Sequence, residues 1–329
     1  VACLSGEYLQ LEDTLAKSLR TVQLARHEPN PQVELLAHFW ASTSHYALGQ
    51  SADAVSHAAT CLKLADRLRV PSQITTALWA NETLARLRGD WTVASEHITR
   101  GLELAPEDSR LLAGKLLMEY QLGDKNGASA TLNKLLDVMY QEDSGPDLEY
   151  ALPAIAVPLL SGMDDYQQYA NAAQSAANTV LSADSVTPSL SLLASAGLAL
   201  AAFEKGNSDD ASAQYESLLK YQGTMLYGGL SAVDRLLALI CMASGRFDDA
   251  AIHFQNSFDF CTDSGYGPEL AQTCHDYSSL LLIRDDQGDR EKAAAMVEQG
   301  MWLTEELGMA NLKSSLRRQK VLTKAYSAS

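Results

Sequence analysis

The sequence predicts an all-α fold, an α-solenoid in which about seven helix hairpins stack into a right-handed superhelix. Signals for strands are nearly absent, and successive turn signals follow runs that favour helix. A glycine also recurs with an alanine five residues after it, at Gly49/Ala54, Gly89/Ala94, Gly123/Ala128, Gly206/Ala211, Gly245/Ala250 and Gly288/Ala293. These glycines are 40, 34, 83, 39 and 43 residues apart. Periods of this length are typical of solenoids, in which each hairpin buries its apolar face against its neighbours. We therefore expect one elongated domain.

The glycine–alanine pattern has a local physical reason. Glycine ends a helix in the left-handed conformation without a steric penalty from a Cβ atom. The polar residues after it suit a turn and the first turn of the next helix. The alanine then lies one turn into that second helix, where a small side chain lets the two helices approach closely. Each pattern therefore predicts one hairpin, whose first helix ends at the glycine.

The spacing of 83 residues is about twice the others and predicts a degenerate repeat. Gly162 divides it into 39 and 44 residues, and residues 163–166 suit a turn. The residue five positions on is Gln167 instead of alanine. Gly6, which is 43 residues before Gly49, marks the second helix of an incomplete first unit.

The expected elements follow in order along the chain. A helix over 4–27, interrupted near 12–13, precedes Pro29 and Pro31. Regular hairpins are expected over 33–68, 74–104, 109–140, 190–221 and 231–260. Pro153 and Pro158 disturb a further hairpin over 148–181. The last repeat is expected around 266–309. The loop 141–147 is a candidate hinge between repeats 1–140 and 141–329, and 223–229 is a glycine-rich connector. A basic helix over 312–326 caps the array.

Several positions of each unit together resemble tetratricopeptide (TPR) repeats. Besides the glycine and the alanine, an apolar or aromatic residue follows about nine positions after the glycine, and one unit has a proline seventeen positions after it, Pro106. The apolar or aromatic residues are Ile98, Leu132, Tyr215 and Phe254. The last repeat is similar to C-terminal repeats of LuxR-type transcription activators and of ATPase-linked adenylate cyclases, through 266–271, Tyr277, 288–293 and 303–309. This resemblance implies a non-enzymatic TPR arm of a bacterial signalling or transcription regulator, located in the cytoplasm.

Charge argues against nucleic acid as a direct partner. The net charge is -16, and acidic residues outnumber basic ones by fourteen to four between 141 and 250. Such a surface repels a phosphate backbone. It is either a solvated outer face or a surface for a basic partner.

The cysteines and the apolar stretches indicate a reduced, non-membrane protein. The five cysteines include no Cys-x-x-Cys pair, which favours free thiols in a cytoplasm. The most apolar stretch, 185–203, contains Pro188 and several serines, so we expect a buried helix and no membrane span. The first residue, Val1, suggests a fragment or a processed chain.

No constellation predicts catalysis, a metal or a cofactor. Residues 123–125, Gly-Asp-Lys, lack the upstream glycine and the following Ser/Thr of a phosphate-binding loop. His38 and His45 are seven residues apart, which is not the four-residue spacing of a chelating pair, and His57 adds no motif.

A binding groove is the stronger hypothesis. Aligning the repeats on their glycines places ten first-helix residues toward a concave surface: Phe39, Thr43, Tyr46, Trp79, Thr83, Arg86, Arg110, Tyr120, Arg235 and Met242. Aromatic residues and arginines in a groove are usual anchors for a peptide or protein partner. Alternatively, the aromatic members belong to the core. A stand-alone scaffold that binds a peptide or protein, and a sensor of a small effector, are the alternatives to the regulator arm.

Overall fold

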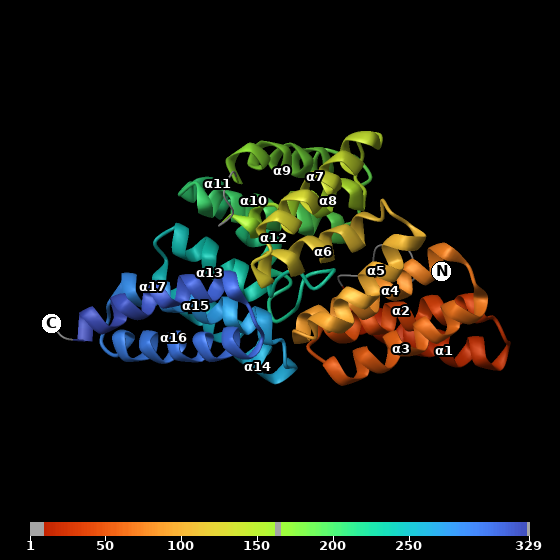
Figure 1. Ribbon diagram of the computed structural model, residues 1–329, viewed down its shortest axis with the longest axis horizontal. Coiled ribbons are helices and arrows are strands. Elements are labelled where there is room, and N and C mark those ends of the chain that lie inside the picture. Colours follow the sequence, from red (N-terminus) through yellow and green to blue (C-terminus); the bar gives the residue numbers. More distant parts are fainter. Residues whose placement is uncertain (1–9, 162–165, 328–329) are drawn as a thin grey trace.

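The computed structural model describes residues 10–161 and 166–327, and its regular elements there are helices (Figure 1). Cys3 and Gly6, and Gly162 with residues 163–165, lie outside the described residues. The helices are α1 (Leu11–His27), α2 (Pro31–Ala47), α3 (Ser51–Leu68), α4 (Pro71–Arg88), α5 (Trp91–Leu104), α6 (Ser109–Leu122), α7 (Lys125–Gln141), α8 (Leu148–Ala156), the 3₁₀ helix η3 (Pro158–Leu160), α9 (Tyr166–Leu181), α10 (Pro188–Glu204), α11 (Ser208–Ser212), α12 (Tyr215–Leu219), α13 (Val233–Ala243), α14 (Phe247–Ser264), α15 (Gly267–Arg284), α16 (Asp289–Glu306) and α17 (Ala310–Ser327).

The all-α helical-repeat fold is confirmed. Sequential helices pack as antiparallel pairs, with α2 on α3, α4 on α5, α6 on α7, α8 on α9, α10 on α11 and α12, α13 on α14, and α15 on α16. The helix α1 precedes these pairs and packs on α2, while α17 follows them and packs on α15 and α16. The division of the chain at 141–147 stays a prediction.

The glycine–alanine pattern has the conformation that it predicted. All six glycines have positive φ, between 65° at Gly206 and 88° at Gly288. All six alanines are fully buried. One detail was wrong: α15 ends at Arg284 with Asp285 in the left-handed conformation, and Gly288 directly precedes α16. This longer turn is closed by Asp289, whose carboxylate accepts hydrogen bonds from the Arg284 side chain at 2.8 Å and the Asp286 N–H at 3.0 Å.

One further expectation needs correction, and another lies partly outside the described residues. The segment 210–221 is not a regular helix, because Gln214 N–H bonds to the Ala211 carbonyl three residues before it (3.1 Å) and separates α11 from α12. Only Ala211 and Leu218 are buried in these two helices, so packing does little to hold a continuous helix. The helix expected over 4–27 is described only from Leu11, where α1 begins, so the interruption expected near 12–13 stays a prediction; both acidic residues there lie in the first turn of α1, where negative charge is favourable.

The array closes on itself, because its N-terminal and C-terminal hairpins are in contact. Figure 1 shows the N-terminal hairpins beside the C-terminal ones, with α7 to α12 above both. The Trp91 indole N–H donates to the Leu307 carbonyl at 2.6 Å, and the Tyr266 hydroxyl donates to the Tyr46 carbonyl at 2.8 Å. Helix α4 contacts α15, and α6 contacts α17. The two ends of the superhelix therefore form one closed ring of hairpins.

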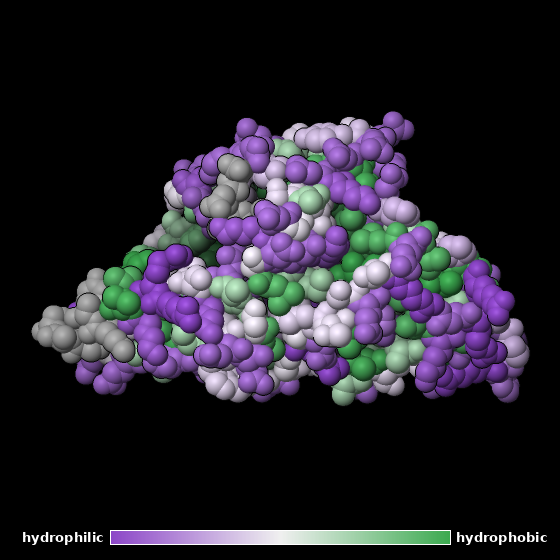
Figure 2. Space-filling model, viewed as in Figure 1, coloured by the Kyte–Doolittle hydropathy of each residue, from purple (hydrophilic) through white to green (hydrophobic). Residues whose placement is uncertain are grey.

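The core runs continuously through this ring, and most of its members are Ala and Leu. Figure 2 shows hydrophilic residues over the outer surfaces and hydrophobic residues gathered where the groups of hairpins meet. No helix within 10–161 or 166–327 is long and apolar enough to span a bilayer.

Candidate functional site

The chain itself covers the first part of the predicted groove. Residues 223–232, between α12 and α13, form a tight antiparallel hairpin, here called the crossing hairpin. Val233 N–H bonds to the Thr224 carbonyl and Leu226 N–H to the Ser231 carbonyl, both at 2.9 Å. Its tip, 227–230, turns through Gly228 and Gly229, which have φ of 75° and 62°. The glycine-rich connector predicted from the sequence is therefore an ordered element that crosses the ring.

The tip of the crossing hairpin packs against the N-terminal hairpins. The Tyr227 ring stacks on Trp40, with centroids 6.3 Å apart, and meets Trp79 edge-on at 5.1 Å. The Gly228 N–H donates to the Tyr46 hydroxyl oxygen at 2.9 Å. The Met225 N–H donates to the Ala47 carbonyl, also at 2.9 Å. Main-chain groups of the hairpin are thus bound much as a groove binds a peptide.

Arg86 holds the same tip and is itself held by Glu82. Its guanidinium donates to the carbonyls of Gly228 at 2.6 Å and Gly229 at 3.0 Å, and to the Glu82 carboxylate at 2.8 Å. Both side chains are buried. Burial raises the pKa of Glu82 above its ordinary value, although the neighbouring Arg86 opposes this change.

Six predicted groove residues therefore lie under the crossing hairpin or beside it. Phe39, Thr43, Tyr46, Trp79, Thr83 and Arg86 are each at most 5% exposed. The Phe39 and Trp79 rings are 6.0 Å apart, and the Thr43 hydroxyl donates to the Phe39 carbonyl at 2.9 Å. Their assignment to a partner-binding groove stays a prediction. The aromatic residues among them belong to the packed interior, which was the alternative to a role in binding a partner.

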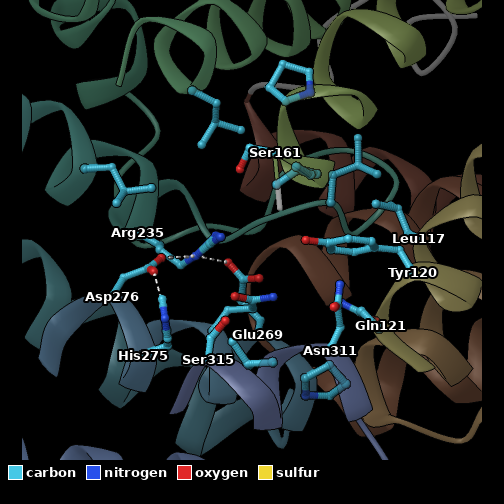
Figure 3. Close-up of a pocket in the computed structure, with 18 of the residues that line it drawn as sticks. Leu117, Tyr120, Gln121, Ser161, Arg235, Glu269, His275, Asp276, Asn311 and Ser315 are labelled. Atoms are coloured by element: carbon cyan, nitrogen blue, oxygen red, sulfur yellow. Dashed lines mark hydrogen bonds and ion pairs between the residues drawn. The ribbon is translucent and has the colours of Figure 1, made fainter. Parts of the chain in front are cut away.

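An open cavity of about 520 Å³ remains in the middle of the ring. It is bordered by α4, α6, η3, α10, α13, α15 and α17, and by the crossing hairpin through Gly229 and Leu230. Of the predicted groove residues, Arg86, Tyr120 and Arg235 border it. Figure 3 shows the Tyr120 hydroxyl and the Arg235 guanidinium pointing toward one another across the open space.

Arg235 is the most unusual group of this cavity. Its side chain is 7% exposed, and its Nε lies 3.5 Å from the Glu269 carboxylate and 3.4 Å from that of Asp276. Nε and Nη1 nevertheless have no hydrogen-bond partner. Burial would raise the pKa of Asp276, but Arg235 and the His275 hydrogen bond at 2.8 Å outweigh it and hold that pKa below its ordinary value. The cavity wall therefore contains a permanent cation with incompletely used donors.

The remaining lining separates into polar and apolar groups. The polar ones include Gln121, Ser161, Asn311 and Ser315, which Figure 3 shows around the open space. Leu159, Leu200, Leu239 and Leu312 supply apolar surface. Glu204 also borders the cavity, and burial raises its pKa above its ordinary value. Such a surface suits a small ligand that has both an apolar part and hydrogen-bonding groups.

The two other predicted groove residues lie elsewhere. Arg110 packs over the Trp79 ring at 5.4 Å and binds Asp108 at 2.6 Å, beside a second, shallower pocket next to 71–75 and 147–149. Met242 packs against the core and does not border the cavity. The alignment missed Glu269, His275 and Asp276. The signal that could have found them is a group of charged residues on the same helix as the apolar Leu270, Ala271 and Cys274.

The three histidines of the sequence analysis do come together, but without a metal-binding arrangement. His38 Nδ1 lies 2.8 Å from His57 Nδ1, and the His45 ring is 5.3 Å from that of His57. Burial, and then the proximity of His57, lower the pKa of His38 to about 4. Among the described residues, no group of three or more His, Cys, Asp and Glu side chains is arranged to hold a metal ion. The four described cysteines are buried and free.

The fold and the cavity together define a helical-repeat protein with an internal cavity, and solved structures resemble it. A tetratricopeptide repeat protein from Parabacteroides merdae is 14% identical, with a TM-score of 0.43 and coverage of 88% of this chain and 98% of that one. Rap protein complexed with competence and sporulation factor is 10% identical, with a TM-score of 0.48 and coverage of 98% and 95%. The P58(IPK) TPR domain is 13% identical, with a TM-score of 0.31 and coverage of 95% and 99%. No protein-family model and no curated protein matches this chain.

Proposed function

We propose that this chain is a non-catalytic binding module that takes a short peptide, or a short segment of a partner protein, into the central cavity. The observation that carries this proposal is Arg235, a buried cation in the cavity wall whose Nε and Nη1 lack hydrogen-bond partners. The two ion pairs of Arg235 leave part of its hydrogen-bonding capacity unused, so a ligand acceptor that reaches the guanidinium gains a charge-assisted hydrogen bond. Tyr120 faces it across the cavity and supplies an aromatic surface for an apolar side chain.

The test is a peptide selection on the intact chain, followed by affinity measurements. Random heptapeptides are selected on immobilised protein, and the binders are measured by calorimetry. We expect Tyr120→Ala and Arg235→Gln each to weaken binding by about thirtyfold, the size of an anchor residue. Tyr140→Ala is the matched control, because this tyrosine is 67% exposed on α7 and does not border the cavity. Binders that are insensitive to both cavity variants would contradict the proposal.

A small effector is the second candidate for the same cavity. Its volume of about 520 Å³ lies within the range of small-molecule sites, roughly 300–1,000 Å³. A thermal-shift screen with a metabolite panel distinguishes the two ligands. A metabolite that stabilises the wild-type chain, but not the Tyr120→Ala variant, would favour the effector over a peptide.

We further propose that the chain serves as the sensing arm of a bacterial signalling or transcription regulator in the cytoplasm. The support is the sequence of the last repeat, 266–309, and the free, buried cysteines. A ligand in the cavity would bias an attached effector domain. The net charge of -16 disfavours direct nucleic-acid binding by this segment. The test is the gene itself: an upstream ATPase, cyclase or helix-turn-helix region supports the arm, and a reading frame without one supports a stand-alone scaffold.

A further inference from the structure

The crossing hairpin is longer than a connection between two repeats requires. Between α3 and α4 the chain needs only two residues, Arg69 and Val70, whereas 220–232 separate α12 from α13. These extra residues are deeply buried: Met225 and Leu226 are each 1% exposed, and Ser231 is fully buried. A segment that buries this much apolar surface contributes to the stability of whatever it contacts.

The hairpin contacts both ends of the array. Its tip is bound by the N-terminal hairpins, through Tyr46, Trp79 and Arg86. Its base is bound by the C-terminal α15, because one oxygen of the Glu269 carboxylate accepts both the Ser231 hydroxyl and the Ala232 N–H at 2.7 Å. The hairpin therefore bridges the two ends of the ring.

The same groups border the central cavity. Arg86, Gly229 and Leu230 line it near the tip, and Glu269 lines it near the base. Glu269 is also the carboxylate beside Arg235, but its hydrogen bonds go to the hairpin. A movement of the hairpin would change the shape of the cavity and the surroundings of Arg235 together.

We propose that the crossing hairpin is a latch that closes the ring and controls access to the central cavity. With the tip in place, the N-terminal and C-terminal hairpins are held together and the cavity is formed. When the tip leaves α2 and α4, the two ends keep only their direct contacts, such as those of α4 with α15 and of α6 with α17, and the cavity opens. This inference goes beyond the proposed function, because it concerns closure of the ring and does not depend on which ligand the cavity takes.

Two glycines of the hairpin provide a matched test. Both have positive φ, +62° at Gly229 and +76° at Gly223, so alanine strains the backbone at either position. A Cβ atom at Gly229 would lie 2.9 Å from Thr83 and 3.0 Å from Leu87, both on α4. A Cβ atom at Gly223 would meet nothing within 4 Å. Gly229→Ala therefore disturbs docking of the tip, while Gly223→Ala reproduces only the strain.

The measurement is amide hydrogen exchange on the full chain, with small-angle scattering as a second readout. In Gly229→Ala we expect the Met225 and Gly228 amides to exchange at least about tenfold faster than in Gly223→Ala, with a larger radius of gyration and unchanged helix content. Equal exchange and equal size in the two variants would overturn the latch.

A wild-type experiment keeps the proposal testable if Gly229→Ala fails to fold. In low concentrations of urea, the Met225 and Gly228 amides of the wild-type chain are expected to exchange through an opening smaller than global unfolding. Exchange of these amides only through global unfolding would show that the hairpin is a permanent part of the core, and the latch would be refuted. A cavity ligand is not needed for either experiment, so failure here leaves the proposed function standing.

Discussion

Gly197→Ala tests whether close helix approach builds the apolar side of the cavity. Gly197 lies in α10, where that helix crosses α8, and a Cβ atom there would lie 2.7 Å from the Ala154 carbonyl carbon and 3.1 Å from the Ile155 nitrogen. Both are main-chain atoms, which cannot turn aside as a side chain can. The substitution must therefore push α8 and α10 apart.

The magnitude follows from two opposing effects. Alanine in place of glycine in a helix interior stabilises by about 1 kcal/mol. Overpacking of a well-packed contact typically costs about 1–3 kcal/mol and more when backbone has to move. Because the clash is with backbone, we expect the second effect to dominate and the variant to lose about 2 kcal/mol of unfolding free energy. Leu159, in η3 directly after α8, and Leu200, in α10, both border the cavity and should separate as well.

Gly101→Ala is the matched control. Gly101 is also a buried helical glycine, in α5, but the three atoms nearest to an added methyl group there all belong to the side chain of Leu111. A rotamer change of that leucine costs about 0.5–1.5 kcal/mol, which nearly cancels the helix gain. Urea unfolding followed by far-UV circular dichroism measures both variants. A Gly197→Ala chain as stable as Gly101→Ala would refute this reasoning about α8 and α10.

Three further predictions concern the buried charges, the histidines and the ring closure. Arg86→Met leaves the Glu82 carboxyl buried without its ion-pair partner, so the free energy of unfolding in urea should fall by about 3 kcal/mol or more. The double variant Arg86→Met/Glu82→Gln should recover part of this loss, and no recovery would contradict the pairing. The pKa of His38 in the folded state is lowered from 6.5 to about 4, so between these pH values the unfolded chain binds a proton that the folded chain does not. The free energy of unfolding should therefore fall as the pH drops from 6.5 to 4, and it should fall less in a His38→Gln chain. An identical pH dependence in the two chains would show that His38 does not contribute. Gly49→Ala should lower the unfolding free energy by about 1 kcal/mol more than Gly245→Ala. Both positions have positive φ, but a Cβ atom at Gly49 would lie 2.5 Å from Ser264 Oγ, whereas one at Gly245 would meet nothing within 4 Å. Equal losses in the two variants would show that close packing at the ring closure does not affect stability.

Much of the fold could be predicted because its repeat is encoded locally. A left-handed glycine and a buried alanine five residues later depend on the chain within one hairpin, as Gly89 and Ala94 illustrate. Gly288 shows the limit of this argument, since Asp289 closes a longer turn through contacts with the Arg284 side chain and the Asp286 N–H that no glycine pattern contains.

The site could be predicted only in part, for a different reason. The alignment selected Tyr46, Trp79 and Arg86 from helix periodicity alone, and the structure brings all three to the tip of the crossing hairpin. What covers them depends on a contact with the crossing hairpin, since Arg86 and Gly229 are 143 positions apart. Local periodicity contains no information about such a pairing, so the division into a filled groove and an open cavity required the structure.

The hydrogen bond between Trp91 and Leu307 joins residues 216 positions apart, and that between Tyr46 and Tyr266 joins residues 220 apart. An open row of repeats folds as its neighbours are added, but here the first hairpins need partners from the end of the chain. At about 5–20 residues per second, translation delivers those partners roughly 10–40 s after the N-terminal hairpins emerge. During that interval the surface that will close the ring is exposed on the nascent chain. Slow, non-local assembly of this kind is the stage at which chaperones are most useful to a repeat protein.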